Sequence, residues 1–130
     1  MLPDAPDENA LRAWHLKQLR WSLHSLANSA SGQPALFPEF APNAEELVYQ
    51  FQHWTAVVRT NYDDELEGAQ RESLAALDRK LVRMSRDGSE FDLDLWTNAA
   101  VRGNEHWNDV RHLATDALVA FGWIDQAVQE

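Results

Sequence analysis

Residues 16–26 read LKQLRWSLHSL, in which a leucine stands at positions 16, 19, 23 and 26. Steps of three and four residues follow the 3.6-residue turn of an α-helix, so these leucines share one face of a helix. The same spacing returns in residues 74–84, LAALDRKLVRM, with apolar side chains at 74, 77, 81 and 84. We therefore predict one amphipathic helix over about 7–28, and another from the acidic turn at 63–67 to about Arg86.

Two further stretches show helical periodicity. One begins at Asn43, with Glu46 at capping-box spacing, and its apolar face holds Leu47, Phe51, Trp54, Val58 and Tyr62. The other follows Gly103 and Asn104 and ends at Gly122, with an apolar face of Trp107, Val110, Ala114, Ala117, Leu118 and Phe121. A short segment around 93–101 is expected to form a brief helix that carries Trp96.

No stretch alternates apolar and polar residues over the length of a strand, and β-branched clusters are absent. All five prolines lie within the first 42 residues, which permits long helices after them. We predict an all-α, four-helix-bundle-like single domain over residues 1–130. It has a long apolar connection between the first two helices and a short extra helix before the last one. Residues 1–6 and 124–130 are expected to be loose tails.

Composition narrows the possible chemistry. The chain has no cysteine, which excludes disulfides, thiolate nucleophiles and cysteine zinc sites within these 130 residues. The glycine-rich phosphate loops, the HExxH zinc motif, the EF-hand calcium loop and the GxSxG serine motif are also absent. The sequence therefore predicts no catalytic residue and no cofactor, and an enzyme is the less favoured expectation.

The net charge of the chain indicates which classes of partner it favours. Formal net charge is −10, although residues 11–27 hold Arg12, Lys17 and Arg20 and no acid. An acidic surface disfavours nucleic acid and anionic lipid, and it favours a basic partner. The first residues lack a basic and apolar leader, and no apolar stretch is long enough to span a membrane, so we expect a cytoplasmic protein.

Surplus apolar surface suggests where a partner binds. Trp14 and Trp21 fall opposite the leucine stripe of the first helix. In the connection before the second helix, Leu36, Phe37 and Phe40 make an apolar cluster. These five residues are our predicted partner-binding set, for an unidentified protein or a second copy of the chain. The alternative is that they fill the core or the end of the bundle.

Three weaker patterns carry possible chemistry. Glu105, Asp109 and His112 share one face of the last helix, at spacings that suit a metal ion, but that face lies opposite the apolar one and should point to water. His53 lies near Tyr49 on the polar side of its helix, where histidine serves as a base only with a partner. The acidic turn at 63–65 lacks the ligand spacing of a cation site.

The leading hypothesis is a small acidic binding or regulatory protein that acts through protein–protein contacts. One alternative is a small helical enzyme or metal-binding bundle that uses the histidine and carboxylate groups. Another is nucleic-acid contact through the basic first helix, where cations and tryptophans interleave.

Overall fold

The computed structural model describes residues 8–27 and 43–124, and within these ranges the chain forms five α-helices and no strand. The elements, in chain order, are α1 (Glu8–Ala27), α2 (Asn43–Tyr62), η3 (Asp63–Glu65), α3 (Gly68–Met84), η4 (Leu93–Trp96), α4 (Asn98–Gly103) and α5 (Glu105–Ala120). The predicted all-α, bundle-like domain is confirmed.

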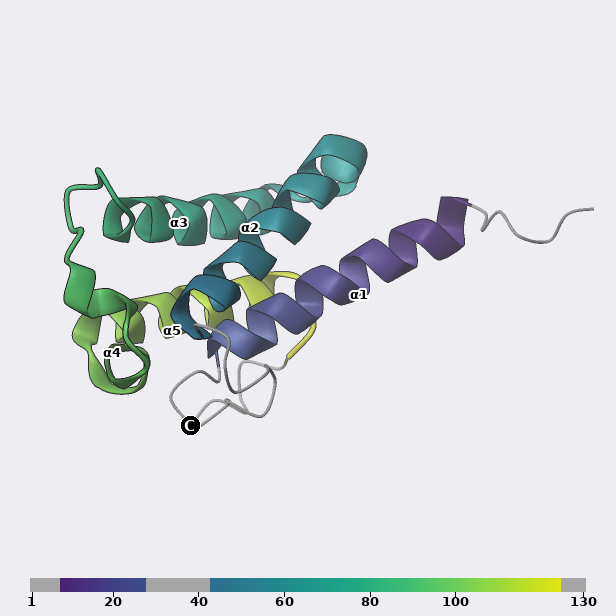
Figure 1. The fold of residues 1–130 in the computed structure, drawn as a ribbon. Coiled ribbons are helices and arrows are strands. Elements are labelled where there is room, and N and C mark those ends of the chain that lie inside the picture. The colour runs from purple at the N-terminus through teal and green to yellow at the C-terminus, as the bar shows by residue number, and fades with distance from the viewer. Residues whose placement is uncertain (1–7, 28–42, 125–130) are drawn as a thin grey trace, which may run out of the picture.

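The main helices pack as neighbouring pairs in the order α2, α1, α5, α3. α1 lies against α2 and α5, and α3 lies against α5 on the other side (Figure 1). The first turns of α1 extend beyond the rest of the bundle, as Figure 1 shows. None of the described helices combines the length and the apolar character that a bilayer span requires.

The apolar stripes predicted from the sequence form the core. Leu19, Leu23 and Leu26 of α1 are fully buried. All four apolar side chains of the α3 stripe are also fully buried, namely Leu74, Leu77, Leu81 and Met84. Each such side chain contributes roughly 1.5–3 kcal/mol by leaving water, so these stripes supply much of the drive to pack.

Side-chain caps divide the segment before the last helix. The Thr97 hydroxyl accepts a hydrogen bond from the Ala100 amide, and the Asn104 side chain accepts one from the His106 amide. Residues 93–101 were expected to form one brief helix, but they are divided between η4 and α4. The physical reason is the extended backbone of Thr97, which ends one element and caps the next.

The connection between α3 and η4 reverses direction within a few residues. The helix ends at Met84, two residues before the predicted end at Arg86. Asp87 takes a positive φ of 73°, and an added Cβ at Gly88 would lie 2.2 Å from the Arg83 carbonyl oxygen. Only glycine fits so close to that backbone. The reversal brings residues 91–96 beside α2, where they form one wall of a cleft.

Two tryptophans fix η4 in place. The Trp96 indole N–H donates to the Met84 carbonyl at 3.0 Å, and the Trp107 indole N–H donates to the Leu95 carbonyl at 2.7 Å. Their rings meet edge to face with centroids 5.8 Å apart. Both N–H groups are thereby satisfied, and η4 is tied to the end of α3 and to α5.

Candidate binding cleft

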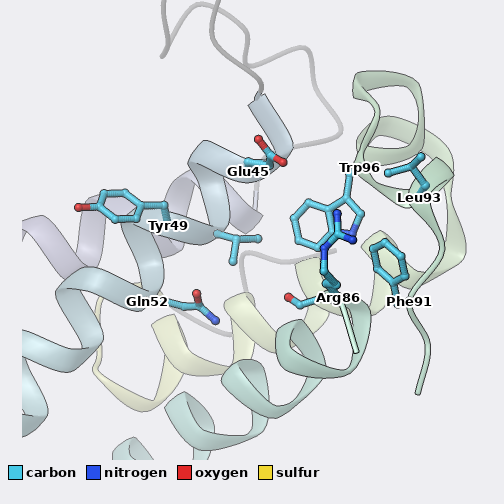
Figure 2. A pocket seen from close by; sticks show the side chains of 9 residues that line it. Glu45, Tyr49, Gln52, Arg86, Phe91, Leu93 and Trp96 are labelled. Atoms are coloured by element: carbon cyan, nitrogen blue, oxygen red, sulfur yellow. The ribbon is translucent and has the colours of Figure 1, made fainter. Parts of the chain in front are cut away.

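A cleft of about 280 Å³ lies between the first half of α2 and the α3–η4 connection (Figure 2). Its lining residues are Glu45, Val48, Tyr49, Gln52, Ser85, Arg86, Phe91, Leu93 and Trp96. This volume lies just below the range for small-molecule sites, about 300–1,000 Å³. The cleft therefore suits one or two side chains of a larger ligand.

Three of the apolar and aromatic lining residues are exposed, whereas Val48 is buried. Leu93 is 69% exposed and Tyr49 is 58% exposed, and Phe91 also faces solvent. In Figure 2, Tyr49 lies on the α2 side of the cleft, and Trp96, Phe91 and Leu93 lie on the opposite side. Exposed apolar groups on both sides of a cleft are candidates for a contact site on a folded protein.

The polar side chains of the cleft are mostly held by other bonds. The Ser85 hydroxyl donates to the Leu81 carbonyl at 2.7 Å, and the Gln52 amide donates to Asp78 at 3.2 Å. The Arg86 guanidinium lies 5.8 Å from the centre of the Phe91 ring. These contacts stiffen the walls, and they commit the Ser85 hydroxyl proton to the Leu81 carbonyl.

An aromatic row leads from the cleft to α1. It consists of Tyr49, His53, Trp54 and Trp14, whose neighbouring ring centroids are 5.7, 4.5 and 5.3 Å apart. Tyr49 stacks on His53, and Trp54 meets both His53 and Trp14 edge to face. Trp14 is 49% exposed at the far end of the row. Tyr49 therefore belongs to both the cleft and the aromatic row.

The five residues of the predicted partner-binding set have different locations. Trp14 lies in the aromatic row, and Trp21 is partly buried and does not line the cleft. Leu36, Phe37 and Phe40 lie outside the described residues. Of the two described members of the set, Trp14 is connected to the cleft through the aromatic row, and the role of the set in binding stays a prediction.

The metal and acid–base candidates do not meet in the cleft. Glu105, Asp109 and His112 are exposed on α5, and within residues 8–27 and 43–124 no three histidine or carboxylate groups are placed to share a metal ion. His53 is exposed and is part of the aromatic row.

Cations of the chain already pair with the acidic turn. Asp63 bonds to Arg59 at 2.7 Å, and Glu65 pairs with Arg12 of the basic first helix. The turn is thereby partly neutralised at the place where α1 passes α2.

A buried lysine is bonded to the connection that forms one wall of the cleft. Lys80 is only 4% exposed, and its ammonium lies 2.8 Å from Glu90, 2.9 Å from His106 Nδ1 and 3.6 Å from Asp109. The hydrogen bond from Lys80, followed by the charges of Lys80 and Arg83, lowers the pKa of Glu90 despite its partial desolvation. Because Glu90 precedes Phe91, the lysine fixes the chain just before the cleft wall.

Sequence reasoning missed the main parts of this site. Lys80 stands between Leu77 and Leu81 at core spacing, which is the signal that could have identified a buried cation. Phe91 and Leu93 stand between acids in the stretch EFDLDL at 90–95, outside every helical stripe. Apolar residues isolated among acids in a connection are candidates for exposed contact groups.

Comparisons of the chain with protein-family models, with curated proteins and with solved structures found no match.

Proposed function

We propose that this protein is a non-catalytic binding module whose cleft holds an apolar side chain of a protein ligand. The observation that carries the proposal is the exposure of Leu93, Tyr49 and Phe91 around a cleft that is already formed. Transfer of these groups out of water would contribute to binding, at about 25 cal/mol for each Å² that a ligand covers.

Rigidity of the walls supports the proposal. Trp96 is fixed by its hydrogen bond to Met84, and the connection is fixed by Lys80 and Glu90. A site that is ordered before the ligand arrives loses little conformational entropy on binding, so a small contact can still be specific.

The composition of the cleft favours binding over chemistry. Its serine and glutamine are engaged in structural hydrogen bonds, and none of the histidines of α2 and α5 lines it. Catalysis by acid and base needs such groups within hydrogen-bond distance of a common reacting atom. The enzyme hypothesis therefore has less support at this site than the binding module.

The test is a selection from a library of random 12-residue peptides displayed on phage. The bait is either the wild-type protein or the double variant Tyr49→Ser/Leu93→Ser, which removes two exposed apolar groups from the cleft. The matched control is Leu11→Ser/Val82→Ser, which removes two exposed apolar groups elsewhere. Peptides should be enriched by the wild type and the control but not by the cleft variant. Equal enrichment by all three baits, or none by any, would overturn the proposal.

A further inference from the structure

The acids around the cleft indicate the chemistry of its ligand. Glu45 lines the cleft, and Asp87, Asp92 and Asp94 lie in or next to the connection that carries Phe91 and Leu93. All four acids are exposed. An apolar cleft with exposed carboxylates near it is complementary to an apolar side chain flanked by cations.

Within the described residues, the protein's own cations do not neutralise these carboxylates, whereas several other acids are paired. Asp63, Glu65 and Glu72 each pair with an arginine, and Glu90 pairs with Lys80. In the described part of the chain, no ion pair involves Glu45, Asp87, Asp92 or Asp94. Their negative charge thus remains available to a ligand.

Arg86, the cation among the described residues that line the cleft, does not cancel the negative charge around it. The Arg86 guanidinium lies over the Phe91 ring, 5.8 Å from its centre. The lining itself holds one acid, Glu45, and one arginine, so the negative charge comes from the exposed acids of the connection and from the net charge of −10 of the whole chain. A field of this sign attracts a cationic ligand and raises the rate of its association.

We propose, on the basis of the proposed function, that the ligand is a basic peptide segment that places one bulky apolar side chain in this cleft and lysine or arginine beside its acids. The same carboxylates would repel an anionic ligand such as nucleic acid. A second copy docked by two-fold symmetry would bring this acidic surface against itself.

The phage selection tests the inference through the charge of the selected peptides. Those enriched by the wild type, but not by Tyr49→Ser/Leu93→Ser, should carry one bulky apolar residue and a more positive net charge than the unselected library. Cleft-dependent peptides that are neutral or acidic would overturn the inference and leave the proposed function standing. The absence of cleft-dependent peptides would overturn both.

A second measurement separates the acids at the cleft from the general field of the protein. The most enriched peptide is synthesised, and its affinity is measured by isothermal titration calorimetry. Glu45→Gln/Asp94→Asn should weaken binding by about three- to tenfold, the range for partly solvated charge pairs. The control Asp64→Asn/Asp116→Asn loses the same charge at exposed positions outside the cleft and should change affinity less than about twofold.

Equal weakening by both double variants would overturn the placement of the cations beside the cleft. The oligomeric state of the wild type, measured by light scattering, completes the test. A dimer that dissociates in the Leu93→Ser variant would identify a second copy as the occupant and overturn the basic peptide.

Discussion

The Lys80 ammonium lies 2.8 Å from Oε1 of Glu90, ten residues further along the chain, and this ion pair closes the connection that follows α3. The two partners have unequal exposure. Lys80 is 4% exposed, whereas the Glu90 side chain is 31% exposed. Loss of the carboxylate would therefore leave a buried cation with weaker compensation, while loss of the lysine would leave a carboxylate that water can reach.

This asymmetry predicts an order of stabilities. Glu90→Ala should lower the melting temperature more than Lys80→Met, because methionine fills a similar volume without a charge. The double variant Lys80→Met/Glu90→Ala should be more stable than Glu90→Ala alone. Thermal unfolding followed by circular dichroism measures all three. A Lys80→Met variant that is less stable than Glu90→Ala would contradict the inferred role of burial.

The same pair predicts how stability depends on pH. The pKa of Glu90 is lowered from 4.5 in the folded protein, first by the hydrogen bond from Lys80. A lowered folded-state pKa means that the carboxylate stabilises the fold above pH 4.5 and that this contribution is lost as pH falls through the folded value. Melting temperatures of the wild type and Glu90→Gln should therefore converge as pH falls below 4.5. A gap that persists at pH 2 would contradict the prediction.

Local periodicity explains why the helices could be predicted. Burial of Leu19 and Leu23 in α1, and of Leu77 and Leu81 in α3, follows from spacing along one helix and needs no knowledge of its neighbours. Helix ends were less predictable. The end of α3 at Met84 depends on the reversal at Gly88, where the chain approaches its own backbone. A tertiary contact of this kind leaves no periodic pattern in the amino-acid sequence.

The glycine at this reversal gives the next prediction. A Cβ at position 88 would lie 2.2 Å from the Arg83 carbonyl oxygen, and backbone cannot move aside as a flexible side chain can. Gly88→Ala should therefore lower stability by more than about 1 kcal/mol and weaken binding of cleft-dependent peptides. Gly103→Ala is the matched control, because nothing lies within 4 Å of its added Cβ. Urea unfolding measures the stability of both variants. An equal loss of stability in the two variants would contradict the steric argument.

The cleft could not be derived from the sequence for a related reason. Tyr49 and Leu93 are 44 positions apart, and they line one cleft only because α2 packs beside the α3–η4 connection. Trp14 was recognised because its position opposite the leucine stripe is a property of one helix. Lys80 was missed because lysines are seldom fully buried without partners, and its partners come from other elements.

His24 supplies a second contribution to the pH dependence of stability, with the same sign as that of Glu90 but nearer neutral pH. Its pKa is lowered from 6.5, first by burial and then by the nearby charge of Arg20. The folded protein therefore favours neutral His24, and stability should decline as pH falls below 6.5. His24→Gln should flatten this decline, while Arg20→Gln should reduce it only in part, because burial is the larger cause. Melting temperatures between pH 5 and 8 measure the slopes, and an Arg20→Gln variant as flat as His24→Gln would contradict that order of causes.

The contrast between a core leucine and a cleft leucine gives the most direct test of the site. Leu77 is fully buried in α3, so Leu77→Ala should cost about 2–5 kcal/mol of stability through lost burial and the cavity it leaves. Leu93 is 69% exposed, so Leu93→Ala should change stability by less than about 0.5 kcal/mol. The same exposed residue should nevertheless matter for the ligand, since an apolar group that does little for the fold is free to contribute to binding. Urea unfolding and peptide titration on one preparation separate the two roles. A Leu93→Ala variant that loses stability but keeps its affinity would assign this residue to the fold and remove it from the binding surface.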